Sequence, residues 1–375
     1  MIIKKPAAAK KRSRSSSHTV VAQARLKTMK KWLARRRLWQ KIILGLLTLF
    51  VVFMATLYIS SLAYRAKHRH EPVTFGVTFI PNYARYYGLD PKDTMLALRD
   101  DLGFKRFRLV SYWEDIEKTP GHYDFSELDW QFDQVDKVNG EVTLSIGLRQ
   151  PRWPECHIPE WAKDEPIDEL YPKLERFMGE VVERYKDRPS LQSYQLENEY
   201  FLKVFGECKD FSRSRLQKEY RFVKQKDPHT PIILSLANNY FGVPTGSPRP
   251  DQFGVSVYKR VFDYTITHRY FDYPFPSWYY TGRAGLTELL TGKPSMLHEL
   301  QAEPWPPTEM LKASFAEQDK SMDAKRLEDR IVYGRNTGFK QIDLWGGEWW
   351  YWRLKKQHDP TVWNAVKSSI PSAEK

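Results

Sequence analysis

The chain has few of the residues and motifs that mark metal, redox or nucleotide chemistry. Its 375 residues include two cysteines and nine scattered histidines, and no HExxH, CxxC or GxSxG motif occurs. Gly292-Lys293 lacks the upstream glycine and the following Ser/Thr of a P-loop. Zinc proteases, dithiol redox enzymes, nucleophile-elbow hydrolases and P-loop proteins therefore have no motif support. We expect no metal ion and no cofactor.

Acidic residues are absent from the first seventy positions. Residues 1–70 hold 17 Lys/Arg, and the first acid is Glu71. Of the 59 basic and 46 acidic residues in the chain, residues 71–375 therefore hold 42 and 46, a net charge of −4. The overall charge of +13 belongs to the tail, so it does not indicate a nucleic-acid partner for the globular part.

Charge is also absent from the 23 residues between Ile42 and Tyr64, which are dominated by Ile, Leu, Val, Phe and Met. As a helix they would cover roughly 34 Å, enough to cross the ~30 Å hydrocarbon core of a bilayer. Fourteen Lys/Arg precede this stretch, so the positive-inside rule predicts a cytoplasmic N-terminus and an exported domain. Small residues at Ser61-Leu62-Ala63 leave open its cleavage as a signal peptide.

The expected organisation is a basic cytoplasmic tail (1–41), a single transmembrane helix (42–64), a linker (65–72) and one globular domain (73–375). In that domain apolar runs of strand length alternate with amphipathic helical stretches, separated by Gly and Pro. We expect strands at Thr74–Ile80, Lys105–Ser111, Glu141–Gly147, Leu191–Glu197, Pro231–Ser235, Phe253–Val257, Ser295–His298 and Gln341–Trp345. We expect helices at Lys92–Leu102, Glu127–Asn139, Ile167–Lys186, Ser212–Lys226, Ser277–Thr291 and Asp319–Thr337.

Eight alternating βα units predict an α/β fold, a (β/α)8 TIM barrel. An open doubly wound sheet would be expected to carry a Gly-rich phosphate loop after an early strand, and none occurs. The stretch from Ser235 to Phe253 is mostly loop, so the fifth crossover helix is expected to be degenerate.

Carboxylates stand at the ends of two predicted strands. The fourth strand ends in Glu197-Asn198-Glu199, and the seventh is followed by Glu299. Chemistry in a βα barrel takes place at the carboxyl ends of the strands, and unpaired carboxylates there are costly to desolvate. Two glutamates facing each other across the barrel mouth are the groups that glycoside hydrolysis needs: one protonates the leaving oxygen and the other attacks the anomeric carbon.

Four segments resemble the clan A glycoside hydrolases, close in style to family 5 cellulase-like and β-galactosidase-like enzymes. They are GFKRFRLVSYWEDIEKTPGHYDFSELD (103–129), LENEY (196–200), KPSMLHELQAEPW (293–305) and LWGGEWWYW (344–352). The resemblance implies a (β/α)8 barrel with a retaining mechanism. It also implies that Glu199 is the acid/base, that Glu299 is the nucleophile, and that their carboxyl groups lie about 5–5.5 Å apart.

The same resemblance implies four further contacts. Arg108 would hydrogen-bond the nucleophile and keep it ionised, and Tyr258 would orient it. Asn198 would contact the sugar 2-hydroxyl, and Trp345 would form the platform under the sugar. His298 departs from the pattern, because a small hydroxyl residue is more usual before the nucleophile.

Alternatives remain open at several of these positions. Glu197 could be the true acid or a buried salt-bridge partner, and Glu303 could be the nucleophile or could shape the following loop. Arg108 could form a structural ion pair, and Tyr258 could belong to the core. Cys156 and Cys208 follow neighbouring strands and could form a disulfide or remain free thiols.

Tryptophans gather at or just beyond the predicted strand ends. Flat aromatic faces stack on sugar rings, so this distribution favours a carbohydrate groove, with Trp113 and Trp305 as further substrate-binding candidates. For any single tryptophan, packing within a loop is the competing explanation. The positions are Trp113, Trp153, Trp161, Trp278, Trp305, Trp345, Trp349, Trp350 and Trp352.

The sequence thus predicts a membrane-anchored retaining glycosidase, expected to be monomeric, that acts on an extracellular poly- or oligosaccharide. A transglycosylase that remodels envelope glycans would use the same two glutamates. A catalytically inactive carbohydrate-binding barrel is the non-enzymatic alternative, and would be expected to have lost one of them.

Overall fold

The computed structural model describes residue 25 and residues 37–203, 205–208, 211–238 and 240–375. The chain divides between Thr56 and Leu57 into two compact units, and each is described by itself.

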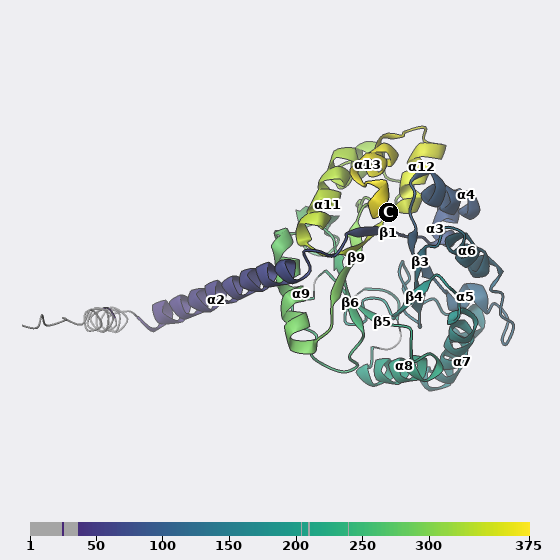
Figure 1. Ribbon diagram of the computed structural model, residues 1–375, viewed down its shortest axis with the longest axis horizontal. Helices are drawn as coiled ribbons and strands as arrows, with labels where there is room; N and C mark the ends of the chain where they lie inside the picture. The colour runs from purple at the N-terminus through teal and green to yellow at the C-terminus, as the bar shows by residue number, and fades with distance from the viewer. Residues whose placement is uncertain (1–24, 26–36, 204, 209–210, 239) are drawn as a thin grey trace, which may run out of the picture. The chain divides into compact units, whose positions relative to one another are not determined.

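Eight parallel strands close into a barrel in the second unit (Figure 1). In order around the barrel they are β1 (Thr74–Thr78), β2 (Arg106–Val110), β3 (Glu141–Ile146), β4 (Leu191–Leu196), β5 (Ile232–Leu236), β6 (Gln252–Val257), β9 (Ser295–Gln301) and β10 (Gln341–Trp345). β10 pairs with β1, with Gln341 opposite Thr74, so the sheet has no free edge. The expected (β/α)8 architecture is confirmed.

Helices surround the barrel (Figure 1). They are α3 (Pro81–Tyr86), α4 (Pro91–Leu96), α5 (Trp113–Ile116), α6 (Ser126–Asp136), α7 (Ile167–Tyr185), α8 (Arg213–Lys226), α9 (Ser277–Thr291), α10 (Phe315–Gln318), α11 (Ala324–Thr337), α12 (Gly347–Lys356) and α13 (Thr361–Ser369). Local sequence explains several helix ends. The side chain of Asp323 accepts the backbone N–H of Arg326 at the start of α11. Gly292 and Gly338 end α9 and α11 with φ of +72° and +85°.

The barrel interior is polar. Arg106 of β2 donates from Nε to Asp343 of β10 at 2.9 Å, and both side chains are buried. Gly76 of β1 makes room for this pair, because a Cβ there would lie 2.3 Å from Asp343 Oδ1. Arg108 follows two residues after Arg106 and so points to the same side of the strand, one layer nearer the carboxyl ends.

Several elements differ from the sequence-based expectation. β9 continues to Gln301, so Glu299 lies within the strand instead of after it. A short antiparallel hairpin, β7 (Arg260–Phe262) with β8 (Tyr270–Asp272), interrupts the connection from β6 to α9. No helix occurs among the described residues between β5 and β6, as expected.

The predicted apolar segment is helical. Helix α2 spans Leu38–Lys67, starting four residues before the expected membrane span and ending three after it. It is long and apolar enough to cross a membrane, and in its most apolar 18 residues only 6% are buried. This composition is compatible with a single-pass anchor.

The end of α2 belongs to the barrel unit. The Tyr64 hydroxyl donates to the backbone carbonyl of Ser295 at 3.2 Å, and Lys67 pairs with Glu288 of α9 at 2.6 Å. Gly282 of α9 permits a close approach, because a Cβ there would lie 2.3 Å from the carbonyl oxygen of Leu57. The segment expected as a linker, 65–72, is therefore helical to Lys67 and bonded to the barrel.

Candidate active site

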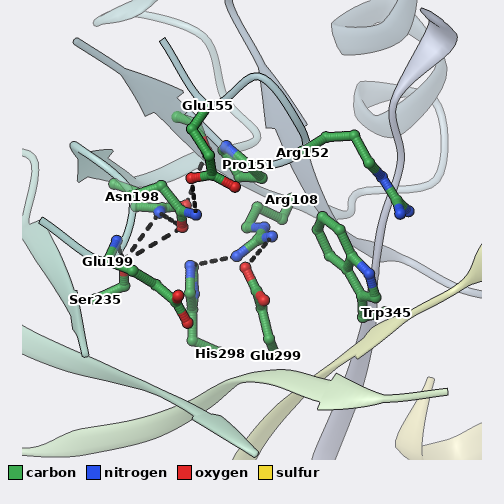
Figure 2. A network of polar contacts seen from close by, with 12 residues as sticks. Arg108, Pro151, Arg152, Glu155, Asn198, Glu199, Ser235, His298, Glu299 and Trp345 are labelled. Atoms are coloured by element: carbon green, nitrogen blue, oxygen red, sulfur yellow. Dashed lines mark hydrogen bonds and ion pairs between the residues drawn. The ribbon is translucent and has the colours of Figure 1, made fainter. Parts of the chain in front are cut away.

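A polar cluster occupies the carboxyl ends of the barrel strands (Figure 2). Parallel strands deliver their last residues to one edge, and β2, β4, β6, β9 and β10 contribute side chains here. The connection between β3 and α7 adds Arg152 and Glu155.

Glu299 of β9 is held by two donors. Arg108 Nη2 donates to its Oε1 at 2.7 Å, and the Tyr258 hydroxyl donates to its Oε2 at 2.7 Å. Arg108 and Glu299 are buried, so the ion pair is shielded from solvent. The resemblance to clan A glycoside hydrolases implied a contact of Glu299 with Arg108 and with Tyr258, and the structure has both.

His298 also contacts Arg108. Arg108 Nη1 lies within hydrogen-bond distance of His298 Nε2. A guanidinium has no acceptor, so Nε2 must accept and the ring proton sits on Nδ1. Burial and the neighbouring Arg108 and Arg106 hold the pKa of His298 well below its usual range, so the imidazole is neutral. Gly254 of β6 gives the ring its space, because a Cβ there would lie 2.8 Å from His298 Cβ.

Glu199 follows β4 in a left-handed backbone conformation, with φ of +41°. Its backbone N–H donates to Ser235 Oγ of β5 at 2.8 Å, which fixes the turn. Burial, followed by the charge of Glu299, raises the pKa of Glu199 to about 7. A buried carboxyl group whose pKa lies near neutral, beside one that receives two hydrogen bonds, is the arrangement expected of an acid and a nucleophile.

Asn198 is engaged by protein groups. Its Oδ1 accepts from Gln195 Nε2 at 2.9 Å, and its Nδ2 donates to Glu155 Oε2 at 2.9 Å (Figure 2). One N–H of the amide remains for another partner. Its predicted contact with a sugar hydroxyl stays a prediction.

Glu155 is a third carboxyl group that sequence reasoning missed. It is 3% exposed, and burial raises its pKa to about 8, with Glu199 and Glu299 adding to the shift. It lies in the middle of an irregular loop, so neither strand periodicity nor a motif indicated it. Cys156 and Cys208 form a disulfide, which was one of the two alternatives that the sequence left open. This disulfide links the loop of Glu155 to the loop after β4.

Glu197 occupies the salt-bridge position that was one of its two alternatives. Arg215 Nη1 of α8 donates to its Oε1 at 3.1 Å, and the backbone N–H of Leu148 donates to the same oxygen at 2.7 Å. Gly147 allows this approach, because a Cβ there would lie 2.5 Å from Glu197 Oε1. Its carboxylate thus joins two loops.

Glu303 is likewise occupied. Arg152 donates to both of its oxygens, at 2.6 and 3.2 Å, and the Trp345 indole N–H donates to Oε1 at 2.9 Å. The same Arg152 guanidinium lies 4.2 Å from the Trp345 ring centroid and 3.4 Å from that of Tyr83. Trp345 is 5% exposed, so its ring offers little area to a ligand in this structure. Its role as a sugar platform stays a prediction.

The tryptophans divide into two groups. Trp305 is partly exposed and packs edge-on against Tyr258, at 5.3 Å between centroids, so it borders the cluster. Trp113 is fully buried, stacks on Phe177 of α7, and donates its indole N–H to Glu117. Packing therefore explains Trp113 in this structure, and its substrate contact stays a prediction. Trp349, Trp350 and Trp352 of α12 are likewise buried.

A separate cavity of about 280 Å³ contains none of the cluster's residues. It is lined by Glu117, Pro120, Gly121, Trp161, Glu165, Lys173 and Arg176. Lys173 Nζ lies over the Trp161 ring, 5.6 Å from its centroid. Among the described residues, no group of three or more His, Cys, Asp or Glu side chains could hold a metal ion.

Solved structures with the same fold are glycoside hydrolases. Exo-beta-1,4-mannosidase Op5Man5 from an Opitutaceae bacterium has a TM-score of 0.51 and 16% identity, over 73% of this chain and 51% of its own. Xylanase 10B from Thermotoga maritima has a TM-score of 0.50 and 15% identity, over 79% and 94%. A GH5_18 protein from Streptomyces cattleya, in complex with Manb1-4GlcNAc, has a TM-score of 0.51 and 12% identity, over 73% and 70%. At this identity the likeness concerns the fold, and in that respect the resemblance to clan A glycoside hydrolases is confirmed.

Sequence comparison gives a shorter match. No family model matches the chain. The beta-galactosidase LacZ of Lactobacillus acidophilus is 24% identical over 151 residues, which are 36% of this chain and 22% of that protein. The chain therefore matches about a fifth of the length of this curated relative.

Proposed function

We propose that the protein is a retaining glycosidase in which Glu199 is the acid/base and Glu299 the nucleophile. The observation that carries the proposal is the contrast between the two carboxyl groups. Glu299 receives hydrogen bonds from Arg108 and Tyr258, while Glu199 is buried with a pKa raised to about 7. The fold shared with glycoside hydrolases supports the same assignment.

The reaction proceeds in two displacements. A Glu299 oxygen attacks the anomeric carbon, the glycosidic C–O bond breaks, and Glu199 gives its proton to the leaving oxygen. Glu199, now a carboxylate, takes a proton from water, whose oxygen attacks the anomeric carbon and releases Glu299. Each step leaves both glutamates ready for the next, and the product keeps the configuration of the substrate.

The proposed organisation is a cytoplasmic tail at 1–41, an anchor at 42–64 whose last residues, from Leu57 on, belong to the barrel unit, and a catalytic domain at 73–375 outside the cell. Helix α2 has the length and composition of an anchor. The disulfide between Cys156 and Cys208 supports an exported domain, because disulfides persist in oxidising compartments. We propose an extracellular poly- or oligosaccharide as the substrate.

The test uses the full chain in detergent micelles, with a panel of aryl glycosides and oligosaccharides and NMR detection of the product anomer. Glu299→Gln should lower turnover of activated aryl glycosides by several orders of magnitude. Glu199→Ala should impair substrates with poor leaving groups much more than activated ones. The control is Glu160→Gln, which changes an exposed carboxylate and should leave turnover unchanged.

Four results would contradict the proposal. Inversion of the anomeric configuration excludes the covalent route, and near-normal activity of Glu299→Gln would move the nucleophile role to Glu303. Failure of the wild type to turn over any glycoside, with retained binding, would favour the inactive carbohydrate-binding barrel. Products longer than the substrate would instead identify a transglycosylase with the same two residues.

A further inference from the structure

Glu155 lies in the polar cluster, and one of its two carboxyl oxygens, Oε2, contacts protein groups. Asn198 Nδ2 donates to Oε2 at 2.9 Å, and Arg149 Nε lies 3.4 Å from the same oxygen. Figure 2 shows the other oxygen, Oε1, turned away from Asn198 and without a contact to the residues drawn. Both Glu199 and Glu299 act electrostatically on this carboxyl, so all three acids share one site.

The backbone around Glu155 is built to hold it there. Glu155 has φ of +72° and Arg152 has φ of +85°, in a region that non-glycine residues avoid. Gly206, from the loop after β4, packs against the side chain, and a Cβ there would lie 2.8 Å from Glu155 Cβ. The disulfide at the next residue, Cys156, joins the same two loops. Both loops therefore restrict where this carboxyl can point.

We propose that Glu155 is a third substrate-binding carboxyl group, in which Oε2 orients the Asn198 amide and Oε1 binds a hydroxyl group of the sugar held between Glu199 and Glu299. The inference deepens the proposed function and rests on it. A carboxyl at this point favours a sugar that offers a hydroxyl oxygen there over one that offers a carboxylate or an apolar substituent.

The protonation of Glu155 determines how it binds. Burial raises its pKa to about 8, and the charges of Glu199 and Glu299 act in the same direction, against Arg149 and the Asn198 amide. The Tyr112 hydroxyl is a further titratable group facing it from the loop after β2. At neutral pH Glu155 therefore carries a proton. Because Oε2 accepts from Asn198, the proton belongs on Oε1, which donates to the sugar.

The test is the pH dependence of KM in full-length protein, with an activated aryl glycoside so that proton donation by Glu199 does not limit the first step. In the wild type, KM should rise roughly tenfold as pH increases from 7 to 9, about the worth of one hydrogen bond to the substrate. Glu155→Gln keeps a donor in place of Oε1–H at every pH, so its KM should stay flat and near the wild-type value at pH 7. Glu155→Ala should have the raised KM at all pH values.

A matched control and a second readout separate the possible failures. Glu160→Gln changes an exposed carboxylate in the same connection and should keep the wild-type profile. NMR of protein with 13C-labelled glutamate carboxyls should show a titration near pH 8 that Glu155→Gln lacks. If that titration is present but KM is independent of pH, or if Glu155→Ala binds normally, the substrate contact is refuted while the glycosidase stands. If no glycoside is turned over, the proposed function fails first and the inference fails with it.

Discussion

Replacement of Glu299 by Gln is the sharpest test of how the two central carboxyl groups interact. The pKa of Glu199 is raised from 4.5 to about 7 by burial first and by the charge of Glu299 second. A shift of this size corresponds to about 3 kcal/mol of preference for the protonated form. Glu299→Gln removes the charge and leaves the burial. The pKa of Glu199 should therefore fall, but remain above 4.5.

The assay is an NMR titration of 13C-labelled glutamate carboxyls in the full chain. The Glu199 signal is assigned by its loss in Glu199→Gln, and its midpoint is compared between the wild type and Glu299→Gln. Tyr258→Phe is a useful companion, because it keeps the charge of Glu299 while removing a hydrogen bond to it. An unchanged Glu199 midpoint in Glu299→Gln would refute the reasoning, since the charge of Glu299 would then not contribute to the raised pKa of Glu199.

Four further predictions concern the same site and its support. Tyr258→Phe should lower kcat/KM by roughly 10- to 150-fold, because it removes a hydrogen bond to a charged group worth about 1.5–3 kcal/mol, with an unchanged thermal midpoint. Arg108→Lys should lower kcat/KM and also the midpoint, because Lys cannot contact Glu299 and the neighbouring histidine together. The pKa of Glu155 is raised from 4.5 to about 8. Its contribution to the free energy of unfolding is therefore fully present below about pH 4.5 and is lost as the pH rises through 8. Glu155→Gln should therefore gain up to about 5 kcal/mol relative to the wild type between pH 5 and 9 in denaturant unfolding. Cys156→Ser removes a cross-link that spans 52 residues and should lower the free energy of unfolding by about 4 kcal/mol. The wild-type chain should resist alkylation without a reductant. Full labelling would contradict the bridge with Cys208.

Local rules were enough to predict the parts of the site that stand on strands. Glu199 and Glu299 follow apolar runs at the spacing of βα units, and parallel strands bring such residues to one edge. Arg108 was placed by the resemblance to clan A glycoside hydrolases, and its strand, β2, is buried throughout. The length of β9 was underestimated, because His298, Glu299 and Gln301 are polar residues of a strand that is buried throughout.

The parts that stand on loops could not be predicted. Glu155 and Arg152 owe their positions to positive φ angles, to a cross-link and to the absence of a side chain at Gly206. Each of these depends on a partner distant in the sequence. Glu197 and Glu303 were the alternatives to the two catalytic glutamates. The salt bridge of Glu197 with Arg215, and that of Glu303 with Arg152, could be recognised only in the structure.

The tryptophans show why the gathering of one residue type at strand ends does not by itself identify substrate-binding residues. Stacking on sugar requires an open ring face, whereas Trp113 and Trp350 are fully buried and Trp345 lies under the Arg152 guanidinium. The Arg152 guanidinium carbon lies 4.2 Å from the Trp345 ring centroid, where a sugar ring stacked on Trp345 would lie. A sugar can use that face only if Arg152 gives up its place between Tyr83 and Trp345, and its bidentate pair with Glu303 opposes the move. The contacts that would have to break are those of the loop that also carries Glu155, so the proposed binding of a sugar at Trp345 would depend on the β3–α7 connection as much as on the strand ends.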